Sequence, residues 1–587
     1  MRNPNKKIPL TRRSFMAKST CASMGITGIV NTLAHLRLIE GALANSTTTV
    51  TGYKALIVMF QFGGTDMGNV LMPGAGHPGR ANYDTHRGVL ALPTGGPNPS
   101  NPIVADNLAA DPGAPAGAEN FALHPALTDV KDMFDAGDVC FAANVGTLVV
   151  PTTAGTYNSV ALPPQLFSHS DQQNEWQSSV PDKPFQSGWC GRIADFLNDE
   201  NPDSKISMSV SLSGVNDIQL GLTQEAPQYS VTNTGAISLN GYGTNYANAL
   251  SDASDPTSYL NGGGNARRLK AFQDIMNYTH DHIFEEGYNG VVRRARENEG
   301  FVGNAIASAQ AILHPDVKTP NGTPVSLYEG IFFLQNKNIN NGNPIVDPGT
   351  LRVNNNNVTT VVNQMPSLAR QLLMITKLMA GRQCLDNRRQ IFFCSYGGHD
   401  THQDQGGYTV ADGYVAGDLD DNMVYLNDSL KAFHDCMKEL ESQESGLPAG
   451  EGFTYNDFIL ASHSDFNRTF TPNGIIPGPS GSDHAWGTHV FAMGGDVKGK
   501  NVFGYYPDLD PTGAWGTPGS SRGRWIPTTA VEQFAAPLAK WLGTDNTEIE
   551  TIFPNLERFA DPFTAGYDPT DYSSMLNNAN MDYINGI

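Results

Sequence analysis

The chain has 587 residues and a formal net charge of −21, with 58 Asp and Glu against 37 Lys and Arg. An acidic balance of this size argues against a general nucleic-acid binder, which needs clustered basic residues to neutralise phosphates. The six cysteines are scattered and show no C-x-x-C spacing, so neither a disulfide framework nor a thiolate zinc site is expected.

The N-terminal segment has the layout of a secretory signal. Arg12 and Arg13 precede an aromatic residue, a short apolar stretch follows over 21–36, and the small residues of 42–44 offer a cleavage site. Paired arginines mark the twin-arginine variant, whose export machinery moves folded proteins. We therefore expect 1–44 to be a signal peptide and the mature protein to be periplasmic or secreted. The alternative is an amphipathic N-terminal helix that stays on the protein.

The rest of the chain shows no linker that divides it into domains. Residues 45–587 are expected to form a single domain, with a cap of loops and helices inserted at about 220–360. Within that cap, 228–265 and the Asn-rich 336–357 have the composition of surface loops, and 266–313 has a helical pattern. No later apolar run approaches the roughly 18 residues of a membrane helix, so no stable membrane span is expected.

Short apolar runs alternate with helical patterns along this domain. The predicted strands are 54–62, 138–144, 205–212, 390–395 and 457–461, and the predicted helices are 125–134, 366–380 and 422–441. Helices that lead into apolar strands predict an α/β fold with a mostly parallel central sheet and helices on both faces. Strands 54–62, 390–395 and 457–461 are expected to be neighbours near the middle of the sheet.

Residues that suit metal binding follow the predicted strands, where open α/β sheets place their ligand sites. Asp66 comes after the glycine pair that ends the first strand. Asp400 and His402 follow strand 390–395, and residues i and i+2 of an extended segment can reach one ion. Each has a structural alternative. Asp66 can cap a helix, and the segment of Asp400 and His402 can be a polar surface turn.

Two further segments continue this pattern. Asp465 follows strand 457–461, and Arg468 can hold an oxyanion bidentately or form a structural ion pair with that aspartate. His484, next to Asp483, and His489 open another apolar strand and offer imidazole ligands. Mixed oxygen and nitrogen donors suit Zn²⁺ or Mn²⁺, with Ca²⁺ possible if carboxylates dominate. We expect one divalent ion to be bound by Asp66, Asp400, His402, Asp465 and at least one of His484 and His489.

A hydroxyl-rich segment supplies the candidate nucleophile. Ser168 and His169 precede a helical pattern that contains Trp176. The Ser168 hydroxyl could act as a nucleophile if a metal lowers its pKa, with His169 at the rim of the same cleft. The alternative is that Ser168 or Ser170 caps the helix, with a Gln or Glu that completes a capping box.

These segments, in this order, resemble a bacterial family designated domain of unknown function 1501. The matching elements are Gly-Gly-x-Asp-x-x-Asn at 63–69, Leu-His-Pro at 123–125, Gly-Trp-x-Gly-Arg at 188–192, Gly-Gly-x-Asp-Thr-His at 397–402, Ser-Asp-Phe-Asn-Arg-Thr at 464–469 and Asp-His-x-Trp-Gly at 483–487. The resemblance covers about 53–563, interrupted by the Asn-rich insertions.

The resemblance implies an alkaline-phosphatase-like fold of the phosphatase and sulfatase superfamily, whose divalent metals hold the nucleophile and the ester oxygens. In that scheme the metal ligands are similar to Asp66, Asp400, His402, Asp465 and either His484 or His489. The chain departs from the scheme at Phe466, which stands where a second ligand His would follow Asp465. No motif of the active enzymes marks Ser168 as the nucleophile.

Two functions from different classes follow. The first is an exported metal-dependent hydrolase of phosphate or sulfate esters, acting on a small-molecule or polymer substrate, with Arg468 stabilising the non-bridging oxygens. The second is a non-catalytic exported protein that keeps the fold for binding or assembly. The ligand residues favour the hydrolase, and the departure at Phe466 and the unmarked nucleophile favour the second function.

Overall fold

The central element of the fold is β1 (Lys54–Gln61), a strand whose residues after Lys54 are all buried. In the computed structural model, β13 (Arg389–Tyr396) and β16 (Phe458–Ser464) pair with β1 on either side, both in parallel. A strand covered on both faces has no polar side, which explains its continuous apolar run. The three strands predicted as neighbours in the middle of the sheet are therefore confirmed as neighbours.

The structure describes residues 52–96, 98–236, 251, 260, 264–276, 298–337, 344–411, 413–448, 450–563 and 581–587. All of them belong to one compact unit, Gly52–Ile587. The predicted signal peptide at 1–44 lies outside the described residues.

The main sheet has ten strands. Its order is β18 (Val502–Gly504), β5 (Val139–Gly146), β17 (Thr488–Met493), β16, β1, β13, β6 (Ser209–Ser211), β7 (Tyr229–Thr232) and β8 (Gly235–Ala236), and β19 (Thr529–Ala530) also pairs with β5. Most pairs are parallel, as predicted, but β17 runs antiparallel to both of its neighbours. The start of β17 therefore lies at the edge of the sheet where β1, β13 and β16 end.

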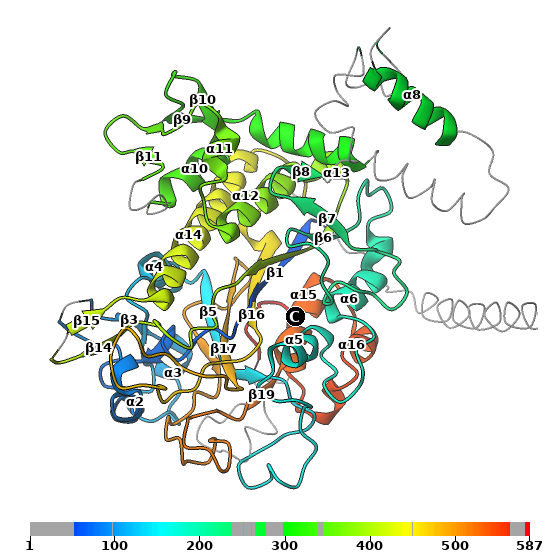
Figure 1. The fold of residues 1–587 in the computed structure, drawn as a ribbon. Coiled ribbons are helices and arrows are strands. Elements are labelled where there is room, and N and C mark those ends of the chain that lie inside the picture. The colour runs from blue at the N-terminus through cyan, green and yellow to red at the C-terminus, as the bar shows by residue number, and fades with distance from the viewer. Residues whose placement is uncertain are drawn as a thin grey trace, which may run out of the picture. The chain divides into compact units, whose positions relative to one another are not determined.

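Helices cover both faces of this sheet, as predicted (Figure 1). Alternate residues of β1 therefore pack into two different hydrophobic cores. The first core contains Ile57 and Met59 and is closed by α4 (Thr128–Asp135), α10 (Leu327–Gln335), α12 (Ser367–Ala380) and α14 (Asp418–Glu444). The second contains Val58 and Phe60 and is closed by α5 (His169–Ser178), α6 (Trp189–Leu197), α15 (Val531–Leu542) and α16 (Asn546–Ile552).

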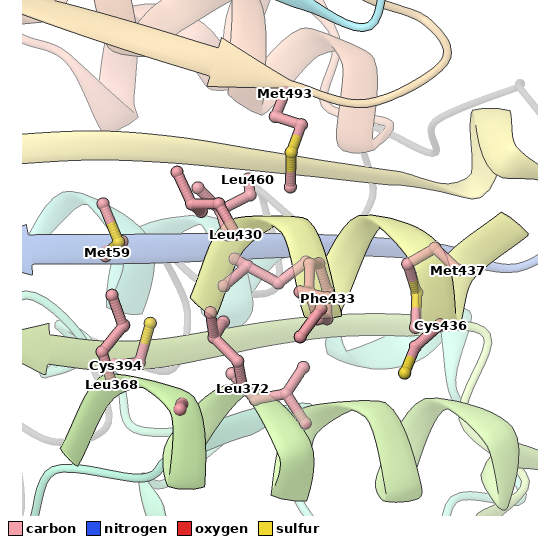
Figure 2. Packing of buried hydrophobic residues seen from close by; sticks show 14 of the residues in the cluster. Met59, Leu368, Leu372, Cys394, Leu430, Phe433, Cys436, Met437, Leu460 and Met493 are labelled. Carbon is pink, nitrogen blue, oxygen red and sulfur yellow. The ribbon is translucent and has the colours of Figure 1, made fainter. Parts of the chain in front are cut away.

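The first core shows how the two long helices hold the sheet. Figure 2 shows Leu372 of α12 and Phe433 of α14 packed beside Met59 and Cys394 from the central strands. Cutting a buried leucine such as Leu372 to alanine typically costs about 2–5 kcal/mol. This packing fixes the direction of β1 and β13, and with it the position of the residues that follow them.

The segment predicted as a cap folds in part into sheets. β7 and β8 extend the main sheet, and a second sheet has the order β10 (Pro324–Ser326), β9 (Leu313–Lys318), β12 (Arg352–Val353) and β11 (Val346–Asp347). The loop predictions are therefore wrong at β7 and β8 within 228–265. They are also wrong within 336–357 at β11 and β12, where Val346 and Val353 are buried cross-strand partners. α8 (Gly264–Met276) agrees with the helical pattern at 266–313, whose middle lies outside the described residues.

Shorter elements complete the described chain. They are a sheet of β2 (Leu71–Pro73), β4 (Asn120–Leu123) and β3 (Asn101–Val104), a hairpin of β14 (Gly407–Thr409) and β15 (Gly413–Val415), and the helices α2 (Arg80–His86), α3 (Asp106–Ala109), α11 (Val358–Val362) and α13 (Arg382–Leu385). Over the described ranges, none of the helices, the 27-residue α14 included, combines the length and apolar character that crossing a bilayer requires.

Candidate metal centre

Two glycines after β1 let three segments meet at the carboxyl edge of the sheet. Gly63 and Gly64 have φ angles of +111° and +74°, a region that glycine adopts without strain. A Cβ on Gly63 would lie 2.6 Å from the backbone nitrogen of Asp400, and one on Gly64 would lie 2.5 Å from the ring of Phe466. The segments after β13 and β16 therefore approach the end of β1 more closely than a side chain there would allow.

Asp400 lies among three imidazoles. Its Oδ1 is 3.1 Å from His402 Nε2, 3.2 Å from His484 Nε2 and 3.5 Å from His169 Nε2. The Nε2 atoms of His402 and His484 are 3.0 Å apart. His169 comes from the first turn of α5, whereas the other residues follow β13 or precede β17. These four residues, called the His₃Asp cluster below, are brought together only by the tertiary fold.

The Nδ1 contacts of His484 and His402 bear on which ring nitrogen faces the cluster with a lone pair. His484 Nδ1 lies 2.8 Å from the carbonyl oxygen of Phe167, which can only accept, so Nδ1 carries the proton of the neutral ring. His402 Nδ1 lies 3.0 Å from Asp483 Oδ1, and its Nε2 lies 3.1 Å from Asp400 Oδ1, so a carboxylate can accept at either ring nitrogen. The Nε2 atoms of His402 and His484, 3.0 Å apart, are stable together when a proton or a metal cation lies between them.

His169 repeats this arrangement with a buried carboxylate. Its Nδ1 is 2.6 Å from Asp465 Oδ2, which also accepts a 2.8 Å hydrogen bond from Gln173 Nε2. The bond to Asp465 is the main cause that raises the pKa of His169. His169 Nε2 is buried and has no hydrogen-bond partner within the described chain, which is costly for a polar atom. Asp465, predicted as a metal ligand, therefore contacts the cluster through His169 instead.

The His₃Asp cluster suits a divalent cation. Histidines that bind metals usually donate their second ring nitrogen to a carboxylate or backbone carbonyl, and all three imidazoles have such an acceptor. Ligand atoms of His169, Asp400 and His484 lie within 4.8 Å of one another. Donors bound about 2.1 Å from one ion are separated by roughly 3–3.5 Å. Two nitrogens and one oxygen from these three residues, with His402 beside them, favour Zn²⁺ or Mn²⁺ over Ca²⁺.

Arg468 lies beside the cluster and is fully buried. Its Nη1 donates to Asp400 Oδ1 at 2.5 Å, and its Nη2 donates to the carbonyl oxygen of Ser482. Burial works to raise the pKa of Asp400, but the hydrogen bond and charge of Arg468 outweigh it and hold that pKa below its usual value. The Asp400 side chain remains 47% exposed, so it stays accessible beside the guanidinium.

Asp66, predicted as the first metal ligand, belongs to a different network. Its buried carboxylate accepts hydrogen bonds from Arg87 and from Gln405. Arg87 is fully buried itself, so the ion pair neutralises Asp66 without a metal. Gln405 Oε1 accepts a 2.5 Å hydrogen bond from Ser482 Oγ, so Asp66 supports the loops around the cluster and is not a member of it.

His489, also predicted as a possible metal ligand, is buried in the core and not in the cluster. It lies in β17 and stacks on Tyr506, with 4.9 Å between the ring centroids. Its Nδ1 accepts a hydrogen bond from the backbone N–H of Asn144, and burial lowers the pKa of His489 to about 3. Of the two histidines predicted as alternatives, the fold brings His484 to Asp400 and uses His489 in the core.

Ser168, the predicted nucleophile, makes its hydrogen bonds outside the cluster. Its Oγ lies 2.6 Å from Asp171 Oδ2 and 3.3 Å from Ser170 Oγ. It stands at the N-cap position of α5, but its side chain makes no capping hydrogen bond. The hydroxyl is thus engaged by a carboxylate of the first helical turn, and the alternative that Ser168 caps the helix is wrong.

Three residues of the site were not predicted from the sequence. Asp483 and Gln173 fix His402 and Asp465, and the carbonyl of Phe167 fixes the tautomer of His484. Asp483 has a signal in its place next to His484. A backbone carbonyl has none, because every residue carries one.

No protein-family model matches this chain, and no curated protein matches it.

Proposed function

We propose that the chain is an exported metal-dependent hydrolase of phosphate or sulfate esters, with the metal held by His169, Asp400, His402 and His484. One observation carries the proposal. Three imidazoles, each with an acceptor at Nδ1, bring Nε2 to within 3.5 Å of the same carboxylate oxygen. Lone pairs and a carboxylate gathered so closely are stable together when they share a cation.

A divalent ion in this position supplies Lewis-acid chemistry, since it lowers the pKa of water and draws charge from ester oxygens. The chain's own groups hold and orient the reactants. Asp465 and Asp483 keep two imidazoles oriented. Arg468 is buried and donates to Asp400 Oδ1, so it holds that carboxylate in place, and it would bind the non-bridging oxygens of an ester only by exchanging that contact.

Water is the better candidate for the nucleophile, because the Ser168 hydroxyl is engaged by Asp171. The water oxygen forms the new bond to phosphorus or sulfur, and the bond to the alcohol oxygen breaks. The water gives up a proton and the departing alcohol takes one. This route forms no covalent enzyme intermediate.

The finer fold and the destination of the protein belong to the same proposal. An alkaline-phosphatase-like arrangement is supported by the position of the cluster, after β13 and before β17 at one edge of the main sheet. Twin-arginine export to the periplasm or medium is supported by Arg12 and Arg13. Replacing both arginines with lysine is expected to retain the precursor in the cytoplasm, and unchanged export of that variant would contradict this route.

A non-catalytic binding or assembly protein is the second candidate. It is favoured by the ion pair between Arg468 and Asp400, which already neutralises the one carboxylate of the cluster. In that case the cluster is a structural or binding site, and ester hydrolysis is absent even when a metal is bound.

Elemental analysis of protein purified through its export route, paired with chromogenic phosphate and sulfate esters, separates these candidates. The hydrolase requires about one Zn or Mn per chain and turnover of one ester class. Chelation should abolish turnover, and returning the metal should restore it. Stoichiometric metal without turnover supports the second candidate. Protein that neither contains nor takes up a divalent metal contradicts the metal site itself.

A further inference from the structure

Two arginines other than Arg468, namely Arg522 and Arg524, lie next to the His₃Asp cluster. Arg524 Nε donates a 2.9 Å hydrogen bond to the carbonyl oxygen of His484. Its guanidinium carbon lies 4.2 Å from the centre of the Phe167 ring, the residue whose carbonyl fixes His484. Stacking holds the plane of the guanidinium next to a cluster ligand. Among the described residues, Arg524 donates a hydrogen bond through Nε alone, so its two Nη groups can bind a ligand.

Arg522 is linked to the cluster through Asp483, which contacts His402. Its Nη2 lies 2.7 Å from Asp483 Oδ2, whose other oxygen is 3.0 Å from His402 Nδ1. Burial is the main cause that lowers the pKa of Arg524, and the nearby charge of Arg522 adds to it. Arg522 and Arg524 are two positions apart in the sequence, and each contacts a different histidine of the cluster, Arg524 at the His484 carbonyl and Arg522 through Asp483.

Without a metal, the three arginines of this region face three carboxylates and the charges balance. Asp483 is the acidic group that faces both arginines, and it also serves His402. A divalent ion in the cluster would add two positive charges. The positive groups would then be the ion, Arg468, Arg522 and Arg524, against the carboxylates Asp400, Asp465 and Asp483. This local excess stands out in a chain with a net charge of −21, and an anion is what would neutralise it.

We infer that Arg522 and Arg524 form a second anion subsite beside the metal cluster, so that the substrate is an ester that carries a further anionic group. The ester part of this inference and the charge excess rest on the proposed function, whereas the partly exposed position of Arg524 does not. Paired guanidiniums bind phosphate, sulfate or carboxylate oxygens through charge-assisted hydrogen bonds. A simple monoester fills the position beside Arg468 and leaves the second subsite without a ligand.

Non-hydrolysable analogues test the subsite without requiring turnover. The probes are phenylphosphonate and its three ring-carboxylated forms, with dissociation constants measured by calorimetry on the protein as purified. At least one carboxylated form should bind about tenfold more tightly than the parent, the gain expected from one charge-assisted hydrogen bond. Sulfonate counterparts of the same compounds show whether the first subsite prefers a phosphate or a sulfate geometry.

The decisive variant is Arg524→Gln, because Arg524 contacts the cluster only through a backbone carbonyl. It should lose the gain from the carboxylate while the affinity for phenylphosphonate and the metal content stay unchanged. Arg524→Lys keeps the charge and should keep part of the gain. The matched control is Arg352→Gln, whose arginine bonds the carbonyls of Thr319 and Pro320 near the second sheet and should leave the gain intact.

The outcomes separate the subsite from the proposed function. Equal binding of all four phosphonates by the unchanged protein overturns the subsite, as does a gain that persists in Arg524→Gln. Protein that lacks metal and turnover, yet shows a carboxylate gain that depends on Arg524, contradicts the proposed hydrolase and supports the subsite.

Discussion

His169 and Asp465 are joined by a 2.6 Å hydrogen bond across 296 positions of sequence. The aspartate is fully buried and also accepts from Gln173, so it holds one imidazole in a fixed orientation toward Asp400. This makes Asp465 a positioning residue for the metal cluster rather than a ligand.

Replacing Asp465 with asparagine should weaken binding of Zn²⁺ by about 10–100-fold, the usual cost of losing an outer partner of a metal-binding histidine. Titration calorimetry measures the change. The matched control is Asp138→Asn, which alters another aspartate–histidine pair, 2.9 Å from His434 and outside the cluster. Asp138→Asn should leave Zn²⁺ affinity unchanged, and equal losses in both variants would refute the special role of Asp465.

His484 and His489 should respond differently to substitution. His484→Ala removes a cluster nitrogen and should lower Zn²⁺ affinity by more than about 100-fold, beyond the effect of an outer partner. His489→Gln should keep the metal and lose stability instead, because it disturbs a buried stack on Tyr506. Metal content by elemental analysis and thermal unfolding measure the two effects. A metal-free His489→Gln protein that is still folded would contradict the assignment.

Ser168→Ala should leave the rate of ester hydrolysis within about twofold of the unchanged protein, because the Ser168 hydroxyl donates to Asp171 and is not the nucleophile of the proposed route. Removing a covalent nucleophile would instead lower the rate by roughly a millionfold. Steady-state rates with the best chromogenic ester measure the effect, and a burst phase is not expected. A Ser168→Ala protein without activity but with its metal retained would restore the covalent route.

Arg468→Lys, by contrast, should lower kcat/KM, because a lysine cannot reproduce the guanidinium fork.

The free energy of unfolding should fall as the pH rises from about 5 to 8, in part because of Glu532. Burial raises the pKa of Glu532 to about 7, whereas an unfolded glutamate titrates near 4.3. Between those values the folded state keeps a proton that the unfolded state has released, so rising pH favours unfolding. Glu532→Gln cannot ionise and should flatten this slope, with about 1–3 kcal/mol gained at pH 8 relative to the unchanged protein.

Urea denaturation at pH 5 and pH 8 measures that slope. The control is Glu550→Gln, an exposed glutamate of α16, which should leave the slope as it is. If Glu532→Gln shows the same pH dependence as the unchanged protein, the buried carboxyl is not the cause.

Much of the fold follows from local sequence. The apolar run of β1 can only be satisfied by burial on both faces, so a central strand was predictable, and so were the two helices with long apolar faces, α12 and α14. The short strands β11 and β12 were not predictable, because two-residue strands form only through their partners. The antiparallel direction of β17 was not predictable either, since a strand carries no local mark of its direction.

The same division holds at the site. Asp400, His402 and His484 were predictable as polar residues next to buried strands, because glycines and apolar runs mark where those strands begin and end. Which of the candidates meet depends on the packing of the whole chain. Asp66 is neutralised by Arg87, 21 positions away, and His489 is taken into the core, while His169 arrives from a helix. The physical reason is that a carboxylate or imidazole looks the same in sequence whether its partner is an arginine, an aromatic ring or a cation. The choice depends on strand direction and on close approach at Gly63, which are properties of the packed chain.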